Sequence, residues 1–405
     1  MMAKKHINPS SNYGPILRNQ LNGVKQTAES FAKIHNLDPE YLKKVMGGNA
    51  PLTMDIINAV QDHPPLNVDL LFDSKDRNMF PRKNDTLDGV VIFTEEQGAE
   101  TQRTFERGPK ERQKIPFYDY RDTAMSRMSS FRPEWIKELY LHDGINKELP
   151  DWAFNNGHFE HQMTYFIGPV NFHWIDKKGN KYVRKMDTGD LNYITPFVPH
   201  SFTTRQKDRG LILAVTYGGA ISTEDFQSEI HSTTSEDYLK NIREKITKIE
   251  LNLLADQLEG VIINHHKDSI KKGINDYAQI ELINNIPYQP NTKAFECYIK
   301  AERTQRDLDS VVNSDRWGYN IGNVPVLLFW DKHNELLYPG DSFFIQPNIY
   351  HSFRNVDQRQ GKLLVMEIKP ETGDPLYELA LINKYAGENG LERVHTETLQ
   401  WYGAK

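Results

Sequence analysis

A stretch of fourteen residues occurs twice in this chain, and the repeat restricts the folds that the sequence can adopt. Residues 189–202 return as residues 340–353, with seven identical positions in the pattern GD-x3-I-x-P-x3-HSF. Each copy predicts a Gly-Asp turn, a short alternating strand, a proline that ends the pairing and a histidine at the lip. Two copies of one β-unit favour a duplicated barrel over one large fold. Small β-barrels of this kind often bind a metal at the mouth.

Bulk composition limits the class of protein and the chemistry of any metal site. The 405 residues carry a net charge of −6 and include one cysteine, Cys297. A lone cysteine excludes intrachain disulfides and cysteine-rich metal sites, so any metal must be held by His, carboxylate or amide groups. No apolar run is long enough to span a bilayer and no signal core is present, so a cytoplasmic protein with no membrane partner is expected.

The order of predicted elements is helical, barrel, helical, barrel, which is an α+β class. Apolar residues between positions 15 and 62 recur at three- and four-residue steps, which is the outline of a helix-turn-helix bundle. Helices are also expected at 238–258, 269–283 and 375–385. The predicted domains are a helical helix-turn-helix-like domain at 1–75, a catalytic barrel at 76–222, a helical domain at 223–290, and a second barrel with a C-terminal helix at 291–405.

Two segments could supply metal ligands in the first barrel. On a strand, alternate side chains share a face, so His158, Glu160 and Gln162 would lie together, with His161 on the other face. His200 comes from the strand unit that carries the repeat. Two histidines and one oxygen donor form the facial triad of non-haem Fe(II) sites. Alternation along the strand allows either Glu160 or Gln162 as the oxygen donor and does not decide between them.

The second copy of the repeat serves as a comparison. Its histidine is His351, but the segment of the second half that matches residues 158–162 contains no histidine. His351 therefore lacks a ligand partner, and the second barrel is predicted to be structural and free of metal.

A further set of polar residues flanks the barrel motifs and could converge on the mouth. An arginine offers a planar fork for a phosphoryl-type oxyanion, and neutral donors would fix its orientation. A lysine far away in sequence lies between two predicted helices. These residues are Arg112, Tyr120, Asn155, Thr216 and Lys25.

Four short motifs, in this order and spacing, resemble those of the hydroxyethylphosphonate dioxygenase and methylphosphonate synthase family. The resemblance spans nearly the whole chain and includes the order of a helix-turn-helix, a cupin barrel, a helical domain and a second cupin barrel. The motifs are Asn22-x2-Lys25-x-Thr27, Arg112-x2-Ile115-x-Phe117-Tyr118-x-Tyr120, Asn155-Asn156-Gly157-His158-x-Glu160 and Pro199-His200-Ser201.

The resemblance implies a cofactor, substrates and a role for each site residue. Fe(II) in the first cupin barrel would bind 2-hydroxyethylphosphonate and O2, with His158 and His200 as ligands. Glu160 is shared across the family without being a ligand. The residues that match phosphonate-holding positions are Arg112, Tyr120, Asn155 and Thr216, while Lys25 caps the substrate and acts with Tyr120 in catalysis. A homo-oligomer is expected.

The third ligand separates the two branches of the family. The dioxygenase branch has a glutamate where this chain has Ile194, and a small residue where this chain has Gln162. The synthase branch resembles this chain at both positions and uses glutamine as a neutral ligand. The resemblance therefore implies the ligand set His158, Gln162 and His200, and release of methylphosphonate and CO2. The alternative is the dioxygenase outcome, hydroxymethylphosphonate and formate.

A transcriptional regulator is the alternative from another class, because a helix-turn-helix joined to a cupin is a common regulator layout. Residues 1–60 carry seven Lys and Arg against four acidic residues, which is a weak excess for binding DNA phosphates. The helix that would enter the groove begins Asp38-Pro39-Glu40, and these carboxylates would repel DNA. No nucleic-acid partner is expected.

Overall fold

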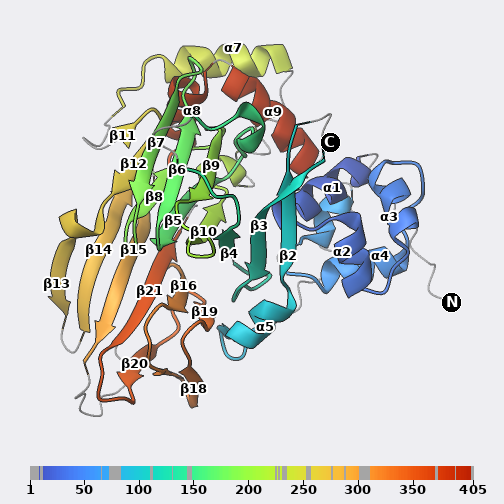
Figure 1. Ribbon diagram of the computed structural model, residues 1–405. Helices are drawn as coiled ribbons and strands as arrows, with labels where there is room; N and C mark the ends of the chain where they lie inside the picture. The colour runs from blue at the N-terminus through green and yellow to red at the C-terminus, as the bar shows by residue number, and fades with distance from the viewer. Residues whose placement is uncertain are drawn as a thin grey trace.

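The computed structural model describes residues 9, 12–64, 66–72, 84–109, 113–129, 131–143, 148–223, 226, 229, 235–251, 257–274, 277–286, 289–300, 311–369, 373–387 and 389–402. Over these ranges the chain is a mixed α+β protein rich in β-sheet, as the sequence predicts (Figure 1).

The N-terminal part of the chain is a bundle of short helices, drawn in blue in Figure 1. They are α1 (Tyr13–Gly23), α2 (Ala28–Ile34), α3 (Pro39–Met46), α4 (Met54–Gln61) and the 3-10 helix η1 (Val68–Leu71). Side chains of Thr27, Asp38 and Thr53 accept backbone N–H bonds at the starts of α2, α3 and α4, so local capping sets these boundaries. The buried faces form a hydrophobic core separate from that of the sheets.

Residues 103–264 supply an antiparallel sheet of eight strands, called the first sheet, and a small three-stranded sheet. The strands are β2 (Arg103–Arg107), β3 (Ile115–Asp122), β4 (Phe131–Glu138), β5 (His161–Ile167), β6 (Val170–Ile175), β7 (Lys181–Met186), β8 (Leu191–Ile194), β9 (His200–Thr204), β10 (Leu211–Tyr217), β11 (Gln257–Leu258) and β12 (Val261–Asn264). The first sheet has the order β11-β12-β8-β5-β10-β4-β3-β2, and the small sheet has the order β7-β6-β9. The two sheets share one hydrophobic core, which includes Tyr165 of β5 and Trp174 of β6.

The second sheet has seven strands and its own three-stranded companion. Its strands are β1 (Val90–Phe93), β13 (Ile270–Ile274), β14 (Tyr277–Ile286), β15 (Gln289–Ile299), β16 (Asp315–Asn320), β19 (Ser342–Ile345) and β21 (Gly361–Ile368), and the companion contains β17 (Val326–Trp330), β18 (His333–Leu337) and β20 (His351–Asn355). The order is β1-β19-β16-β21-β15-β14-β13, with β18-β17-β20 beside it. This order matches that of the first sheet from β12 to β2, strand for strand.

The repeated sequence unit occupies the same place in both halves. In each copy a glycine with positive φ, Gly189 at +97° and Gly340 at +95°, precedes a four-residue strand. The proline follows the strand, and the histidine opens the next one, β9 or β20. The turn, strand and histidine that the repeat predicts are therefore confirmed.

Each large sheet is completed by a strand from outside the range predicted for its domain. β1 lies within 76–222 but pairs with β19 of the second sheet, with Val90 opposite Ile345. β12 lies within 223–290 but pairs with β8 of the first sheet, with Val261 opposite Ile194. Each large sheet therefore contains a strand from beyond its predicted range, which short-range sequence patterns do not reveal.

The helix predicted at 269–283 is wrong. This segment forms β13 and most of β14, and of the predicted helical region at 223–290 only α7 (Ser235–Ile246) is a long helix among the described residues. Apolar residues at 270, 274 and 278 have helical spacing, but Ile280 and Leu282 are buried at alternate positions. Pairing along the length of β15 favours the strand over the helix.

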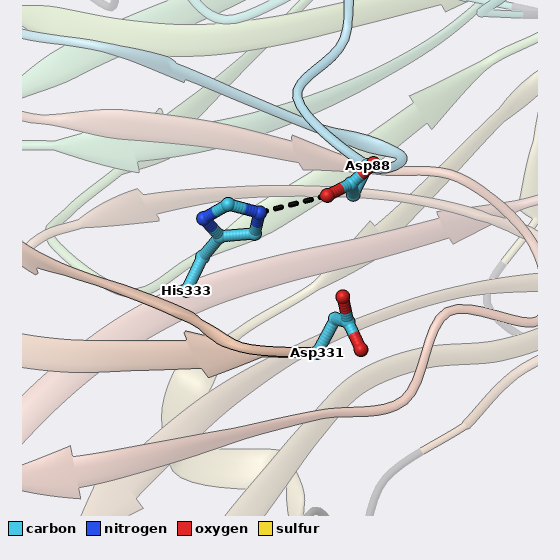
Figure 2. A group of neighbouring side chains, drawn as sticks. All are labelled: Asp88, Asp331 and His333. Carbon is cyan, nitrogen blue, oxygen red and sulfur yellow. Dashed lines mark hydrogen bonds and ion pairs between the residues drawn. The ribbon is translucent and has the colours of Figure 1, made fainter.

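The segment before β1 is fixed to the companion of the second sheet. Figure 2 shows His333 at the start of β18 facing Asp88, at 2.7 Å from ring Nε2 to Oδ2. Asp331 lies beside this pair, and one nitrogen or oxygen atom from each of the three side chains lies within 4.8 Å of the other two. The indole N–H of Trp330 donates to the carbonyl oxygen of Leu87 at 3.0 Å. Both contacts hold the β1 segment against the second half of the chain.

Three helices pack together at one end of the molecule, at the top of Figure 1: α7, α8 (Pro375–Ala386) and α9 (Asn389–Tyr402). The helix predicted at 375–385 is confirmed as α8, whereas α9 was not predicted. Arg393 of α9 donates to the carbonyl oxygens of Asn156 at 2.8 Å and Gly157 at 3.2 Å, so this helix supports the loop before β5. In the described part of the chain, no helix has the length and apolar character needed to cross a bilayer.

Candidate metal centre

A cavity of about 410 Å3 opens between the α1–α2 turn and the strands of the first sheet. Seven of the eight residues predicted for the site line it: Lys25, Tyr120, Asn155, His158, Gln162, His200 and Thr216. The eighth, Arg112, lies outside the described residues. Residues that are up to 191 positions apart in sequence are therefore gathered around one space.

His158 lies in the loop before β5 and presents one ring nitrogen to the cavity. Its Nδ1 lies 2.8 Å from the carbonyl oxygen of Glu160, which can only accept a hydrogen bond. The ring proton is therefore on Nδ1, and Nε2 carries a lone pair. Burial lowers the pKa of His158, which keeps the ring neutral near pH 7.

His200, the first residue of β9, is held in the same way. Its Nδ1 lies 2.9 Å from the carbonyl oxygen of Val198, while its Nε2 accepts a hydrogen bond from the Asn155 amide at 3.0 Å. Burial holds the pKa of His200 well below its ordinary value, and the nearby His158 lowers it further. The two imidazole rings lie perpendicular, with centroids 5.1 Å apart. A backbone carbonyl on Nδ1 is the usual way to orient a metal-binding histidine.

Gln162 supplies an oxygen beside the His158 ring. Its amide nitrogen donates to the hydroxyl of Thr164 at 2.8 Å, which turns Oε1 toward His158 Nε2 at 3.1 Å. Two lone pairs then face each other without a proton between them, an arrangement that a cation would stabilise. Divalent first-row metals bind N and O donors at about 2.0–2.2 Å, so two ligands at right angles lie about 3 Å apart. The donor set and spacing therefore fit a metal ion.

The strand-parity argument for Glu160 is wrong. β5 begins at His161, so residues 158–160 belong to a loop and do not alternate between faces. The Glu160 carboxylate instead bonds to the guanidinium of Arg132 at 3.1 Å. Burial alone would raise the pKa of Glu160, but Arg132, His158 and Lys25 outweigh it and lower that pKa.

Ile194 lies directly opposite Gln162 in the pairing of β5 with β8, and it is fully buried. It therefore forms an apolar wall next to the amide. This is the position at which the dioxygenase branch of the family that the motifs resemble carries a glutamate. Within the described residues, the oxygen donor that faces His158 Nε2 is an amide.

The cavity also carries hydrogen-bond donors suited to an anion. Lys25, from the turn between α1 and α2, lines the cavity of its own chain. Burial, reinforced by the nearby carboxyl group of Glu134, raises the pKa of Tyr120 well above its ordinary value, so its hydroxyl stays protonated as a hydrogen-bond donor. Thr216 sits opposite Gln162 in β10, which places its hydroxyl beside the proposed metal position.

Sequence reasoning missed Arg107, the last residue of β2, which also lines the cavity. Its guanidinium stacks over the rings of Phe117 and Tyr118, at 5.1 and 5.3 Å, and bonds to the carbonyl oxygen of Ala153. Residues 103–107 are Arg-Thr-Phe-Glu-Arg, and one apolar residue among five gives no alternation that would predict this strand.

A second missed residue is Glu134 of β4, which is 8% exposed and lines the cavity. Its Oε1 has no hydrogen-bond partner among the described residues. Burial raises the pKa of this carboxyl, and the nearby charge of Lys25 opposes that rise. A buried carboxyl of this kind in a cavity is available to a bound molecule.

The second sheet has a counterpart to this centre, identified by strand register. Gln162 pairs with Ile194 of the first repeat, and Arg316 pairs with Ile345 of the second. The guanidinium of Arg316 contacts His351 Nε2 and bonds to Glu367 at 2.5 Å. In the second sheet, a guanidinium therefore occupies the place next to the histidine of the repeat.

Models of known protein families give no match to this sequence. The chain is 30% identical to methylphosphonate synthase from Nitrosopumilus maritimus (strain SCM1), over 95% of this chain and 94% of that protein. The structure is similar to that of Streptomyces albus hydroxyethylphosphonate dioxygenase (HEPD) with 2-hydroxyethylphosphonate and Fe(II) bound. That match has a TM-score of 0.61 and 25% identity, and covers 92% of this chain and 95% of that one. A cadmium complex of PhpD with hydroethylphosphonate, at 16% identity and a TM-score of 0.54, shares the fold over 96% of this chain and 99% of that chain.

Proposed function

Because the chain belongs to the methylphosphonate synthase family, we propose that it is a non-haem Fe(II) oxygenase that converts 2-hydroxyethylphosphonate to methylphosphonate and CO2. Atoms balance when O2 is consumed and one water is formed for each carbon–carbon bond broken. The alcohol carbon supplies all the electrons that O2 requires, so no separate reductant is needed.

The observation that carries the proposal is the grouping of unprotonated donors around one cavity. His158 Nε2 and Gln162 Oε1 face each other at 3.1 Å, and the His200 ring lies 5.1 Å from the His158 ring between centroids, with its Nε2 unprotonated. These three residues would hold Fe(II) through neutral atoms. Iron bound there would supply open coordination positions for O2 and for the hydroxyl and phosphonate oxygens of the substrate.

The branch of the reaction is assigned from the third ligand. An amide at Gln162 in place of a carboxylate leaves the iron site one unit more positive, and Ile194 offers no carboxylate in compensation. This extra charge would hold the formate that forms on cleavage of the carbon–carbon bond longer in the cavity. One hydrogen atom from that formate would then pass to the carbon of the phosphonate fragment, with iron accepting the remaining electron, which would give methylphosphonate and CO2.

The phosphonate end of the substrate is assigned to the cationic side of the cavity. Lys25 and Arg107 supply positive charge, while Tyr120, Asn155 and Thr216 supply neutral donors that set the orientation. Arg112 is proposed as a further phosphonate-binding residue from the family motif. Lys25 and Tyr120 have the catalytic roles in this assignment.

The architecture proposed for the chain is two cupin-type barrels behind a helix-turn-helix-like domain. The shared strand order of the two large sheets and the equivalent position of the repeat support the duplication. Arg316, which takes the place of a ligand beside His351, supports a structural role for the second barrel without metal.

The test is reconstitution of the purified chain with Fe(II) under anaerobic conditions, addition of 2-hydroxyethylphosphonate and then O2, and product analysis by phosphorus NMR. Methylphosphonate as the main product is expected. Hydroxymethylphosphonate as the main product would overturn the branch assignment, and loss of both products with iron bound would overturn the reaction.

The repeat provides a matched control for the metal ligands. His200→Gln is expected to lose bound iron and turnover, because it removes an imidazole donor. His351→Gln removes the corresponding histidine of the second copy and is expected to keep one iron per chain. Equal iron loss in both variants would contradict the assignment of the ligands.

A further inference from the structure

The turn that carries Lys25 is tightly folded but belongs to the helical bundle. Lys25 has φ +54°, in the left-handed region that non-glycine residues rarely adopt. The backbone N–H of Lys25 donates to Asn22 at 3.0 Å, and that of Gln26 donates to Leu21 at 2.9 Å. These bonds shape the turn from within, but they do not fix its position over the first sheet.

Arg103 connects this turn to the sheet. Its Nη2 donates to the carbonyl oxygen of Val24 at 2.9 Å, and its Nε donates to the carbonyl oxygen of Lys25 at 3.2 Å. Arg103 lies in β2, 78 residues further along the chain than Lys25. One planar guanidinium therefore holds two consecutive carbonyl groups of the turn.

The guanidinium is itself fixed in place. Its Nη1 lies 2.9 Å from the carboxylate of Asp122 at the end of β3, and 3.3 Å from the carbonyl oxygen of Thr101. The side chains of Arg103 and Asp122 are 12% and 17% exposed, so water competes weakly for these bonds. Arg103 is not among the described residues that line the cavity, so it does not touch a molecule bound there.

We propose that Arg103 is a positioning residue, which holds the backbone of the α1–α2 turn so that the Lys25 ammonium reaches the substrate in the cavity. The inference rests on the proposed function for the identity of the substrate, and on the hydrogen bonds of Arg103 to Val24 and Lys25 for the clamp itself. A lysine side chain has several rotatable bonds, so its reach is reproducible only where its backbone is fixed. Without the clamp, the bundle could shift over the sheet while each part kept its own core.

The first test needs neither metal nor substrate. Hydrogen–deuterium exchange of the metal-free chain is compared for the wild type, Arg103→Ala and Arg103→Lys. Faster exchange at the amides of residues 24–27 is expected in Arg103→Ala, with unchanged exchange in β5 and β10. Lysine keeps the charge but cannot bond both carbonyls at once, so the exchange rate in Arg103→Lys is expected to lie between those of the wild type and Arg103→Ala. Unchanged exchange in the turn of Arg103→Ala would overturn the clamp.

Arg121 provides the matched control. It lies in β3, pairs with Glu95 at 2.8 Å and stacks on Trp135 at 4.4 Å, and among the described residues it makes no hydrogen bond or ion pair with the turn. Arg121→Ala is expected to leave both the exchange of the turn and the kinetics of the enzyme unchanged. An equal effect of Arg121→Ala and Arg103→Ala would mean that general destabilisation, and not positioning, explains the result.

The second test is steady-state turnover of 2-hydroxyethylphosphonate by Arg103→Ala, Lys25→Ala and the double variant. Arg103→Ala is expected to lower kcat/KM on the order of 10²-fold, mainly by raising KM, and Lys25→Ala is expected to act in the same way. Loss of folded protein would lower the apparent kcat and leave KM unchanged. In the double variant, the loss is expected to match that of Lys25→Ala within about twofold, because Arg103 acts through Lys25.

The outcomes separate the clamp from the proposed function. If the wild type turns over the substrate and the loss of kcat/KM in the double variant equals the product of the two single losses, Arg103 acts independently of Lys25 and the inference fails. If the wild type does not turn over the substrate, the proposed function fails, while the exchange measurement still decides whether Arg103 holds the turn.

Discussion

Replacement of Gly157 by alanine should disrupt the metal centre through the backbone alone. Gly157 has φ +69°, and a Cβ at this position would lie 2.4 Å from the carbonyl carbon of Phe197. Left-handed backbone costs an alanine about 1–2 kcal/mol, and ordinary contact requires a further separation of about 1 Å. The neighbouring His158 would have to move with the loop, because the backbone N–H of Phe197 donates to the carbonyl oxygen of His158 at 2.8 Å. We expect Gly157→Ala to bind Fe(II) about 10- to 100-fold more weakly, as loss of an orienting contact usually does.

The variant Gly179→Ala is a control that distinguishes the steric clash at Gly157 from the strain of a left-handed backbone. Gly179 has φ +85°, in the Lys178-Gly179-Asn180 turn, and a Cβ there would meet nothing within 4 Å. Gly179→Ala should therefore lose the same 1–2 kcal/mol or so of stability in urea unfolding and keep its iron affinity. Fe(II) affinity is measured by competition with a chelating dye under anaerobic conditions. Wild-type affinity in Gly157→Ala would refute the claim that packing against Phe197 sets the position of His158.

Three further predictions follow from the same contacts. Gln162→Glu should shift the product from methylphosphonate toward hydroxymethylphosphonate, measured by phosphorus NMR, because a carboxylate ligand removes the extra positive charge. Arg316→Met should cost about 3–5 kcal/mol in urea unfolding without loss of iron, because it leaves the carboxylate of Glu367 buried without its guanidinium. The free energy of unfolding should decrease as the pH is lowered from 6.5, because burial lowers the pKa of His173 and of His351 to about 3 in the folded chain. The unfolded chain then binds more protons, and each histidine should cost about 2 kcal/mol of stability by pH 5, measured by urea unfolding at each pH.

The helical bundle and the repeated unit could be predicted because their signals are local. Apolar spacing, caps and glycines define α1 to α4, and the repeat defines a turn, a strand and a histidine in each half. The family predicted from four short motifs is confirmed by the relative at 30% identity. The four motifs could identify the family because each of them contributes at least one described residue to the lining of the same cavity.

Other features depend on contacts that no local pattern records. β1 and β12 pair with strands that are far away along the chain. Val90 and Ile345 are 255 residues apart, and Val261 and Ile194 are 67 residues apart, unlike the paired residues of a hairpin. The alternation of side chains along a strand does not apply to Glu160, because β5 starts one residue after it. Arg103 and Arg107 lie on the short strand β2. Arg103 contacts the helical bundle and Arg107 lines the cavity, so this strand lacks the apolar alternation that would predict it from sequence.

The two copies of the repeat show why the histidine of the motif could not by itself identify the metal site. His200 and His351 open equivalent strands, and each turns Nδ1 toward a backbone carbonyl and Nε2 toward the interior. What differs is the strand paired with β8 or β19, which carries Gln162 in the first sheet and Arg316 in the second. The amide leaves room for a cation beside neutral donors, whereas the guanidinium places a covalently attached cation there and Glu367 balances it. We therefore expect a positive charge beside the imidazole in both halves, from the proposed iron in the first sheet and from Arg316 in the second.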